Sequence, residues 1–167
     1  MNIILKLFIL ITLFLSTVSC SESVITKDGG LLIEKPVSLQ QLNESSYKQA
    51  MDRVWKQYND DLNYSSLILD QFVRKNISSK EAFVSTISIY ILNKETLNAI
   101  NLIAPPESYW ENHNTSISIL IDIGDFYWNM AKYYETQDRI YAIQARTKYN
   151  QSSYDYDLIH ISNSRGA

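Results

Sequence analysis

The sequence predicts an all-α protein, an antiparallel up-and-down four-helix bundle behind an N-terminal signal peptide. Glycine and proline are almost absent after Ser38, which is typical of long helices. Apolar residues in that region recur at spacings of three and four, the period of one helix face. The same region lacks the alternating pattern of a strand, and the connections between its amphipathic segments are short. These features favour the bundle.

Residues 1–19 have the features of a secretory signal peptide. Lys6 supplies a positive charge, an apolar run covers Leu7 to Leu15, and small residues follow before Cys20. That run is shorter than the roughly 20 apolar residues that a membrane-spanning helix needs. We therefore predict export of the chain and removal of residues 1–19.

The only cysteine, Cys20, directly follows the predicted signal. Thr17-Val18-Ser19-Cys20 resembles the lipobox of prokaryotic lipoproteins, in which the cysteine becomes the lipidated first residue. Val18 and Ser19 fit that pattern, whereas Thr17 stands where leucine is usual. We expect lipidation at Cys20 and a cell-membrane lipoprotein that faces outside the cytoplasm. Secretion after ordinary cleavage, or a retained signal anchor, are the alternatives.

Composition limits the classes of partner and fold. The formal net charge of −3 becomes more negative when Lys6 is removed, and no basic cluster interrupts the acidic balance, so we expect no nucleic acid partner. A single cysteine excludes an internal disulfide. The chain beyond the signal is long enough for one domain with its own core.

The predicted domain order is simple. Residues 20–37 form a polar tether that contains Gly29-Gly30 and Pro36. The bundle covers 38–160, and a polar tail covers 161–167. The four helices are expected at about 38–75, 79–103, 106–135 and 138–160.

The first two helices are placed by apolar stripes and by a cap. The first stripe is Tyr47, Met51, Val54, Tyr58, Leu62, Leu69 and Phe72. Ser78 and Glu81 form a capping box at the start of the second helix. Its inward residues are Phe83, Ile87, Tyr90, Leu97 and Ile100, and Lys94 fits this face poorly. Pro105 disfavours helix at Ala104, so the second helix ends before it.

The third helix has the longest uninterrupted stripe, which is Trp110, His113, Ile117, Leu120, Gly124, Tyr127, Ala131 and Tyr134. Apolar flanks on both sides, Ile119 and Ile123 on one and Ile121 and Trp128 on the other, leave only a narrow polar stripe. This helix is therefore either embedded among three neighbours, or one flank faces a partner or ligand. A mid-helix glycine is unfavourable, so Gly124 predicts close approach of a neighbouring helix.

The fourth helix carries a less apolar inner face, formed by Tyr141, Ala145, Tyr149, Ser152, Tyr156 and Ile159.

Motifs for known chemistries are missing from the sequence. It contains no Glu-x-x-His pair for a di-iron centre, no haem-attachment motif and no nucleotide or nucleophile motif, so we expect no catalytic residue, cofactor or metal. Asp60-Asp61 and Asp122 with Asp125 are expected to be solvated charges. His113 is expected to bond a neighbouring tyrosine or carbonyl. Sequons for glycosylation occur at Asn43, Asn63, Asn76, Asn114 and Asn150.

The layout resembles a loose group of small exported helical-bundle proteins of unknown function from archaea and bacteria, many of them lipoproteins. The matching features are Trp55 with Tyr58, the segment Asn76 to Ala82, and Ala104-Pro105-Pro106 followed by His113. In that group a proline pair and a histidine about two turns later open the third helix. The resemblance covers roughly residues 45–150 and implies a fold and a location but not an activity.

Three hypotheses for function follow. The first is a non-enzymatic envelope protein that binds a protein partner or supports a surface assembly. The second is a bundle that binds a small ligand in its core, lined by Trp110, His113, Tyr127 and Trp128. The third is an enzyme of unrecognised type. A closed core with a hydrogen-bonded His113 would count against the ligand hypothesis, and an open cavity beside it would favour it.

Overall fold

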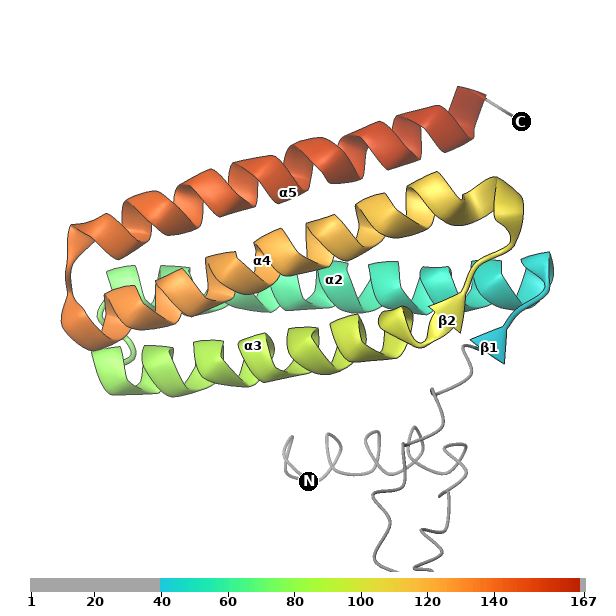
Figure 1. Ribbon diagram of the computed structural model, residues 1–167. Helices are drawn as coiled ribbons and strands as arrows, with labels where there is room; N and C mark the ends of the chain where they lie inside the picture. The colour runs from blue at the N-terminus through green and yellow to red at the C-terminus, as the bar shows by residue number, and fades with distance from the viewer. Residues whose placement is uncertain (1–39, 166–167) are drawn as a thin grey trace, which may run out of the picture. The chain divides into compact units, whose positions relative to one another are not determined.

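The computed structural model describes residues 40–165, and side chains from 42 to 159. Its four long helices are α2 (Glu44–Val73), α3 (Ser79–Asn101), α4 (Trp110–Thr136) and α5 (Arg139–Arg165). Successive helices run in opposite directions, so the chain goes up and down through the bundle (Figure 1). The predicted all-α antiparallel four-helix bundle is confirmed. The predicted signal peptide, the predicted tether and Cys20 lie outside the described residues.

Two short strands delay the start of the first helix. Gln40–Gln41 (β1) pairs in parallel with Ile103–Ala104 (β2), and the Leu42 N–H donates to the Ala104 carbonyl at 3.4 Å. The Asn43 side chain then accepts from the Ser46 N–H at 2.9 Å and caps α2. The helix expected from about residue 38 therefore begins at Glu44.

The connection between α2 and α3 contains the capping box that the sequence predicts. Ser78 Oγ accepts from the Glu81 N–H at 3.2 Å, and Glu81 Oε2 accepts from the Ser78 N–H at 2.7 Å. Lys75 has a φ of 60°, which turns the chain out of α2. Together these contacts fix where α3 begins.

Two further boundaries differ from those expected. After Pro105 and Pro106 the chain first makes a short 3₁₀ turn, η1 (Glu107–Tyr109), and the α-helix starts only at Trp110. The end of α4 at Thr136 agrees with the expected one, and Gln137, with a φ of 59°, terminates the helix in the left-handed conformation. The helix α5 continues to Arg165, so most of the expected polar tail from 161 onward is helical.

The expected stripes of α2 and α3 are confirmed in part: Tyr47, Met51, Val54 and Tyr58 of α2 and Leu97 and Ile100 of α3 are buried, whereas the rest of each buried stripe differs. On α2 the buried residues are Tyr47, Met51, Val54, Tyr58, Asp61, Ser65 and Ile68, whereas Leu69 is exposed. On α3 they are Ala82, Thr86, Ile89, Asn93, Leu97 and Ile100. Phe83, Ile87 and Tyr90 are only half-buried. From Ala82 to Asn93 the buried residues of α3 each lie one position before the expected ones, which explains why Lys94 fitted poorly.

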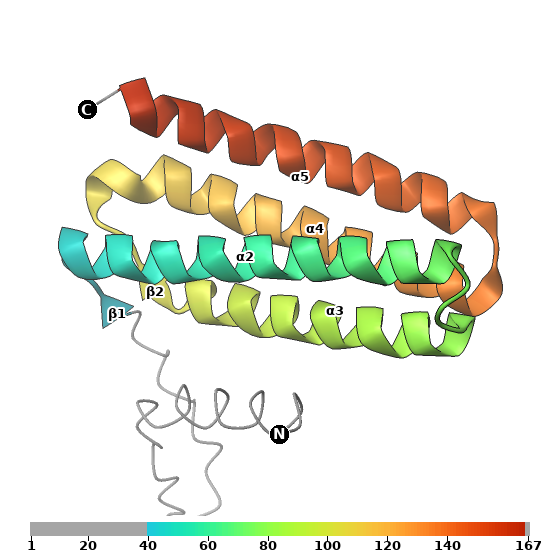
Figure 2. The same cartoon turned by 180° about the vertical axis from the view of Figure 1, so that it is seen from behind.

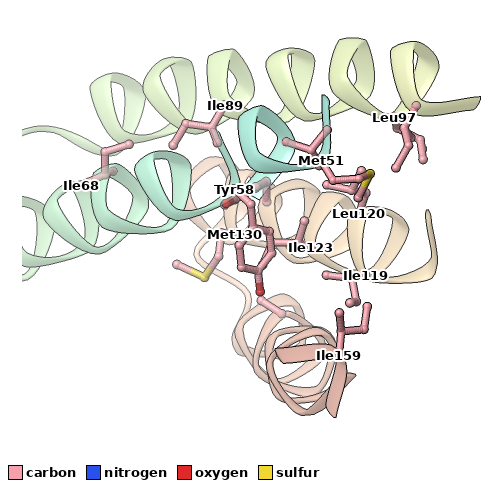
Figure 3. Close-up of a cluster of buried hydrophobic side chains, with 14 of the residues drawn as sticks. Met51, Tyr58, Ile68, Ile89, Leu97, Ile119, Leu120, Ile123, Met130 and Ile159 are labelled. Atoms are coloured by element: carbon pink, nitrogen blue, oxygen red, sulfur yellow. The ribbon is translucent and has the colours of Figure 1, made fainter. Parts of the chain in front are cut away.

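The helix α4 is the central packing element of the bundle. It packs against both α3 and α5, and its stripe is buried from His113 to Tyr134, with Ile117 half-buried. Figure 2 views the bundle from the side of α2, with α4 behind α2 and below α5. Ile119 of α4 and Ile159 of α5 lie next to each other in the core (Figure 3). None of the helices in the described part of the chain is long and apolar enough to cross a membrane.

Candidate functional site

The four residues expected to line a ligand site all belong to α4 but lie in different surroundings. Trp110 is the first residue of the helix and is 47% exposed, whereas His113, one turn later, is buried. Tyr127 is fully buried roughly 20 Å further along the helix axis. Trp128, its neighbour in sequence, points outward and is 42% exposed. The structure therefore does not bring these four side chains into one pocket.

His113 is hydrogen-bonded inside the core. Its Nδ1 atom lies 3.2 Å from the Tyr47 hydroxyl oxygen. The His113 ring also lies near the Trp110 ring, with ring centroids 6.5 Å apart. Burial lowers the pKa of His113, so the imidazole is neutral near pH 7 and Nδ1 can accept the tyrosine proton. Burial also raises the pKa of Tyr47 to about 12, which keeps this hydroxyl protonated. This arrangement gives His113 a structural role and counts against a ligand site beside it.

At the end of the bundle where His113 lies, polar contacts on the surface connect η1 to α2. The Tyr109 hydroxyl donates to Glu44 Oε1 at 2.8 Å, and Lys48 Nζ lies 2.7 Å from the same oxygen. The Tyr109 ring also packs against the Tyr47 ring, with centroids 5.1 Å apart. These contacts hold η1 against the first turn of α2.

A second polar cluster lies further along the bundle, where α2, α3 and α4 meet. A shallow hollow there is lined by Gln57, Tyr58, Asp61, Asn93, Thr96, Leu120, Ile123 and Tyr127. These side chains leave no room for a water molecule between them. Tyr127 is thus the one predicted ligand-lining residue that borders this hollow.

Asp61 is the charged residue of this cluster. The expectation that Asp60 and Asp61 are both solvated is correct for Asp60, which is exposed and pairs with Lys56 at 3.2 Å. It is wrong for Asp61, which is only 7% exposed and accepts from Gln57 Nε2 at 2.7 Å. Burial raises the pKa of Asp61 to about 6; the Gln57 hydrogen bond opposes this change, and the charge of Asp60 adds to it.

Asn93 and Tyr127 complete the cluster. They are 3% and 0% exposed, and neither Asn93 Oδ1 nor the Tyr127 hydroxyl has a hydrogen-bond partner within the described residues. The Asn93 side chain lies directly against Gly124, where an added Cβ would be 2.5 Å from Oδ1. The predicted close approach at Gly124 is confirmed, and the approaching group is a polar side chain of α3.

The other aspartates noted in the sequence connect two helices. Lys148 of α5 lies 2.7 Å from Asp122 and 3.1 Å from Asp125 of α4. These are partly solvated ion pairs, and Asp122 is the more buried of the two carboxylates.

Trp128 belongs to a surface that we call the Tyr90–Trp128 face, formed by Tyr90, Lys94, Ile121, Trp128 and Lys132. The Tyr90 and Trp128 rings have centroids 5.4 Å apart. Lys94 lies over the Tyr90 ring at 5.4 Å, and Lys132 lies over the Trp128 ring at 5.1 Å. Ile121, two turns before Trp128 on the same side of α4, is 43% exposed. This face is an exposed aromatic and aliphatic surface flanked by two lysines.

The sequence reasoning missed Asp61 and Asn93, although their positions carried a signal. Asp61 follows Tyr58 by three residues and precedes Ser65 by four, so it continues the stripe of α2 without a break. Asn93 follows Ile89 by four residues and precedes Leu97 by four, so it likewise continues the stripe of α3. A stripe traced through spacing alone, without requiring an apolar residue at each step, would have found both.

Comparison with known proteins identifies no relative of this chain. No protein-family model, no curated protein and no solved structure matches the chain. Among the described residues, no three histidine, cysteine, aspartate or glutamate side chains gather in a group that could hold a metal ion.

Proposed function

We propose that this chain is an exported, lipid-anchored envelope protein that binds a protein partner through its Tyr90–Trp128 face and has no catalytic activity of its own. The anchor rests on the signal-like residues 1–19 and on the lipobox-like sequence that ends at Cys20. The tether 20–37 would separate the bundle from the membrane. The four-helix bundle would serve as a rigid support for the docking face.

The open flank of α4 carries this proposal. The two apolar flanks of α4 are not equally covered: Ile119 is fully buried, whereas Ile121 and Trp128 are 43% and 42% exposed. Tryptophan and tyrosine are enriched at the centres of protein interfaces because they bury much apolar area with little loss of conformational freedom. A pair of such rings, with an exposed isoleucine two turns away on the same side of α4, is a suitable centre for an interface.

The lysines define the chemistry of the partner. Lys94 and Lys132 lie over the two rings, and Lys132 also contacts Glu135 at 2.7 Å. A partner that packs an apolar side chain on the two rings, and places carboxylates near the two lysines, would complement both the aromatic surface and the positive charges. We therefore propose a protein surface with an apolar ridge bordered by acidic residues.

Crosslinking in cells tests the docking face. A photo-reactive amino acid at position 128 is expected to give a discrete adduct with one envelope protein. The matched control is position 154 on α5, because Tyr154 is also an exposed aromatic residue, at 61%. Equal crosslinking from both positions, or adduct from 154 alone, would contradict the proposed face. An adduct from 128 that persists when Lys94 and Lys132 are both changed to glutamate would contradict the proposed acidic partner.

The mass of the intact protein tests the anchor separately. After detergent extraction, we expect a chain that begins at Cys20 and carries added acyl mass. The Cys20→Ser variant is expected to lose that mass. An unmodified chain of soluble mass would contradict the lipid anchor without affecting the docking face.

A further inference from the structure

The cluster of Asp61, Asn93 and Tyr127 has more buried hydrogen-bonding groups than partners. Asp61 accepts from Gln57, but Asn93 Oδ1 and the Tyr127 hydroxyl have no partner among the described residues. Buried polar groups in folded proteins are nearly always satisfied, because an unpartnered group loses its hydrogen bonds to water without replacement. Other polar groups of this core do have partners: the Tyr58 hydroxyl lies 3.1 Å from Ser152 Oγ, and Tyr47 bonds His113.

Asn93 Oδ1 is an acceptor without a donor, and the Tyr127 hydroxyl, which can both donate and accept, has no partner within hydrogen-bond distance among the described residues. An amide oxygen and a carboxylate both accept, and the carboxylate adds a negative charge. The causes acting on Asp61 are burial, the Gln57 amide and the Asp60 carboxylate, and no lysine or arginine of the described residues is among them. A ligand of this cluster would therefore have to carry positive charge or donate a hydrogen bond.

The size of the hollow limits which ligand the cluster can bind. The hollow has no room for a water molecule. A bound metal ion would need several oxygen ligands around it, and Asp61 is the only ionised group that the cluster offers. A proton needs no space, and it converts the Asp61 carboxylate from an acceptor into the donor that Asn93 Oδ1 lacks.

We propose that the Asp61–Asn93–Tyr127 cluster is a proton-binding site in the middle of the bundle. On mild acidification Asp61 takes a proton from solvent, its carboxylate becomes a neutral carboxyl group, and the new O–H donates to Asn93 Oδ1 or to the Tyr127 hydroxyl. This hydrogen bond joins α2 to α3 or α4 at the point where the three helices meet. The protonated bundle is more tightly held than the deprotonated one.

The groups around Asp61 support this direction of change. On its own helix Asp60 carries a negative charge, and Tyr58 is a neutral phenol. From α3 the hollow is bordered by Asn93 and Thr96, which do not titrate. From α4 it is bordered by Tyr127, whose pKa is raised chiefly by burial and further by the Asp61 charge. Tyr149 of α5 adds a smaller effect on Tyr127.

The sign of the pH dependence follows from the pKa of Asp61. Its ordinary value of 3.8 applies to the unfolded chain, and burial raises it to about 6 in the folded protein. Between these values the folded protein binds more protons than the unfolded chain, so the stability contributed by Asp61 is greatest at low pH and is lost as the pH rises through about 6.

Urea unfolding of three proteins tests the proposal. The wild type, Asp61→Asn and the matched control Asp60→Asn would be compared between about pH 5 and about pH 8. The asparagine amide supplies a neutral donor at position 61 at every pH. We expect the Asp61→Asn midpoint to exceed that of the wild type increasingly as the pH rises through about 6. Asp60→Asn should keep the wild-type fall in stability, displaced slightly to lower pH, because the Asp60 charge is the smallest of the causes acting on the Asp61 pKa. A constant difference between Asp61→Asn and the wild type would overturn the proposal.

A spectroscopic measurement on the wild type keeps the proposal testable if Asp61→Asn does not fold. The side-chain carboxyl carbon of Asp61, followed by NMR, is expected to titrate with a pKa near 6 and to change together with the Asn93 amide and Tyr127 ring signals. Titration of Asp61 in the ordinary range would overturn it. Stabilisation by sodium or calcium at constant ionic strength, lost in Asp61→Asn, would identify a metal cation as the ligand and would also overturn it.

Discussion

The two flanks of α4 have similar composition and opposite surroundings. On one flank Ile119 is buried against α5, where its carbonyl accepts from Ser152 Oγ at 3.3 Å, and Phe126 meets Tyr149 with ring centroids 5.6 Å apart. On the other flank Ile121 and Trp128 stay exposed beside α3. The apolar residues of α4 cover more of its circumference than a surface helix needs, and only one of the two apolar flanks is buried in the core. Only the covered half stabilises the bundle, and the open half is available to a partner.

The largest effect is expected from removing a side chain on the buried flank, compared with the same change on the exposed flank. Ile119→Ala should lower the free energy of unfolding by about 2–5 kcal/mol, because it removes a fully buried side chain and leaves a cavity. Ile121→Ala, two residues away, should change it by less than about 1 kcal/mol. Urea unfolding of both variants checks this pair. Similar losses in both would mean that the flank beside α3 is also covered.

A smaller effect is expected at the boundary between the flanks, where Gly124 meets Asn93. Gly124→Ala places a methyl group 2.5 Å from Asn93 Oδ1, so we expect a loss of about 1–3 kcal/mol despite the better helix propensity of alanine. Adding Asn93→Ala removes the clashing oxygen. The double variant should therefore be less destabilised than the sum of the two single variants. Additive losses would mean that the two residues are not in contact.

Two tyrosine hydroxyls inside the bundle should respond differently to removal. Tyr47→Phe loses the hydrogen bond to His113 and leaves Nδ1 without its donor, so we expect a loss of about 1–2 kcal/mol. Tyr127→Phe removes a hydroxyl that has no partner among the described residues, so stability near pH 7 should be unchanged or slightly higher. Thermal unfolding of the two variants checks this contrast. A larger loss in Tyr127→Phe would reveal a hydrogen bond at that hydroxyl.

The smallest expected effect on stability concerns Trp128. Trp128→Ala should cost less than about 1 kcal/mol, since the ring is 42% exposed and packs mainly on Tyr90 and Lys132. The same variant should abolish capture of the envelope partner. Loss of both stability and partner binding would assign the ring to the fold, not to the interface.

The fold was predictable because it depends on features that a sequence displays directly. The capping box at Ser78 and Glu81 places α3, and the uninterrupted stripe from His113 to Tyr134 places the inner face of α4. Caps and apolar periodicity are local properties, so they can be read without knowing the neighbours of a helix. The delayed start of α2 could not be predicted, because it depends on pairing of Gln40–Gln41 with a segment distant in the chain.

The candidate sites were less predictable because they depend on which polar residues become buried. Asp61 and Asp60 are adjacent and chemically identical, yet only Asp61 lies on the core side of α2. Similarly, Trp128 extends the apolar surface of α4 as strongly as Ile123 does, but Ile123 is fully buried and Trp128 is 42% exposed. Such differences follow from the rotation of each helix in the bundle. On α3 the buried residues from Ala82 to Asn93 each lie one position before the expected ones, so the burial of Asn93 was not predicted.

The most direct test of the open flank is thiol labelling of the protein in its native envelope. Ile121→Cys on α4 and Ile143→Cys on α5 replace two exposed isoleucines, and Cys20, the only other cysteine, would be blocked by lipid. In the purified protein both new thiols should react with a maleimide. In intact envelopes we predict that position 121 is protected while position 143 still reacts. Equal reaction at both positions in the envelope would contradict the claim that this flank binds a partner.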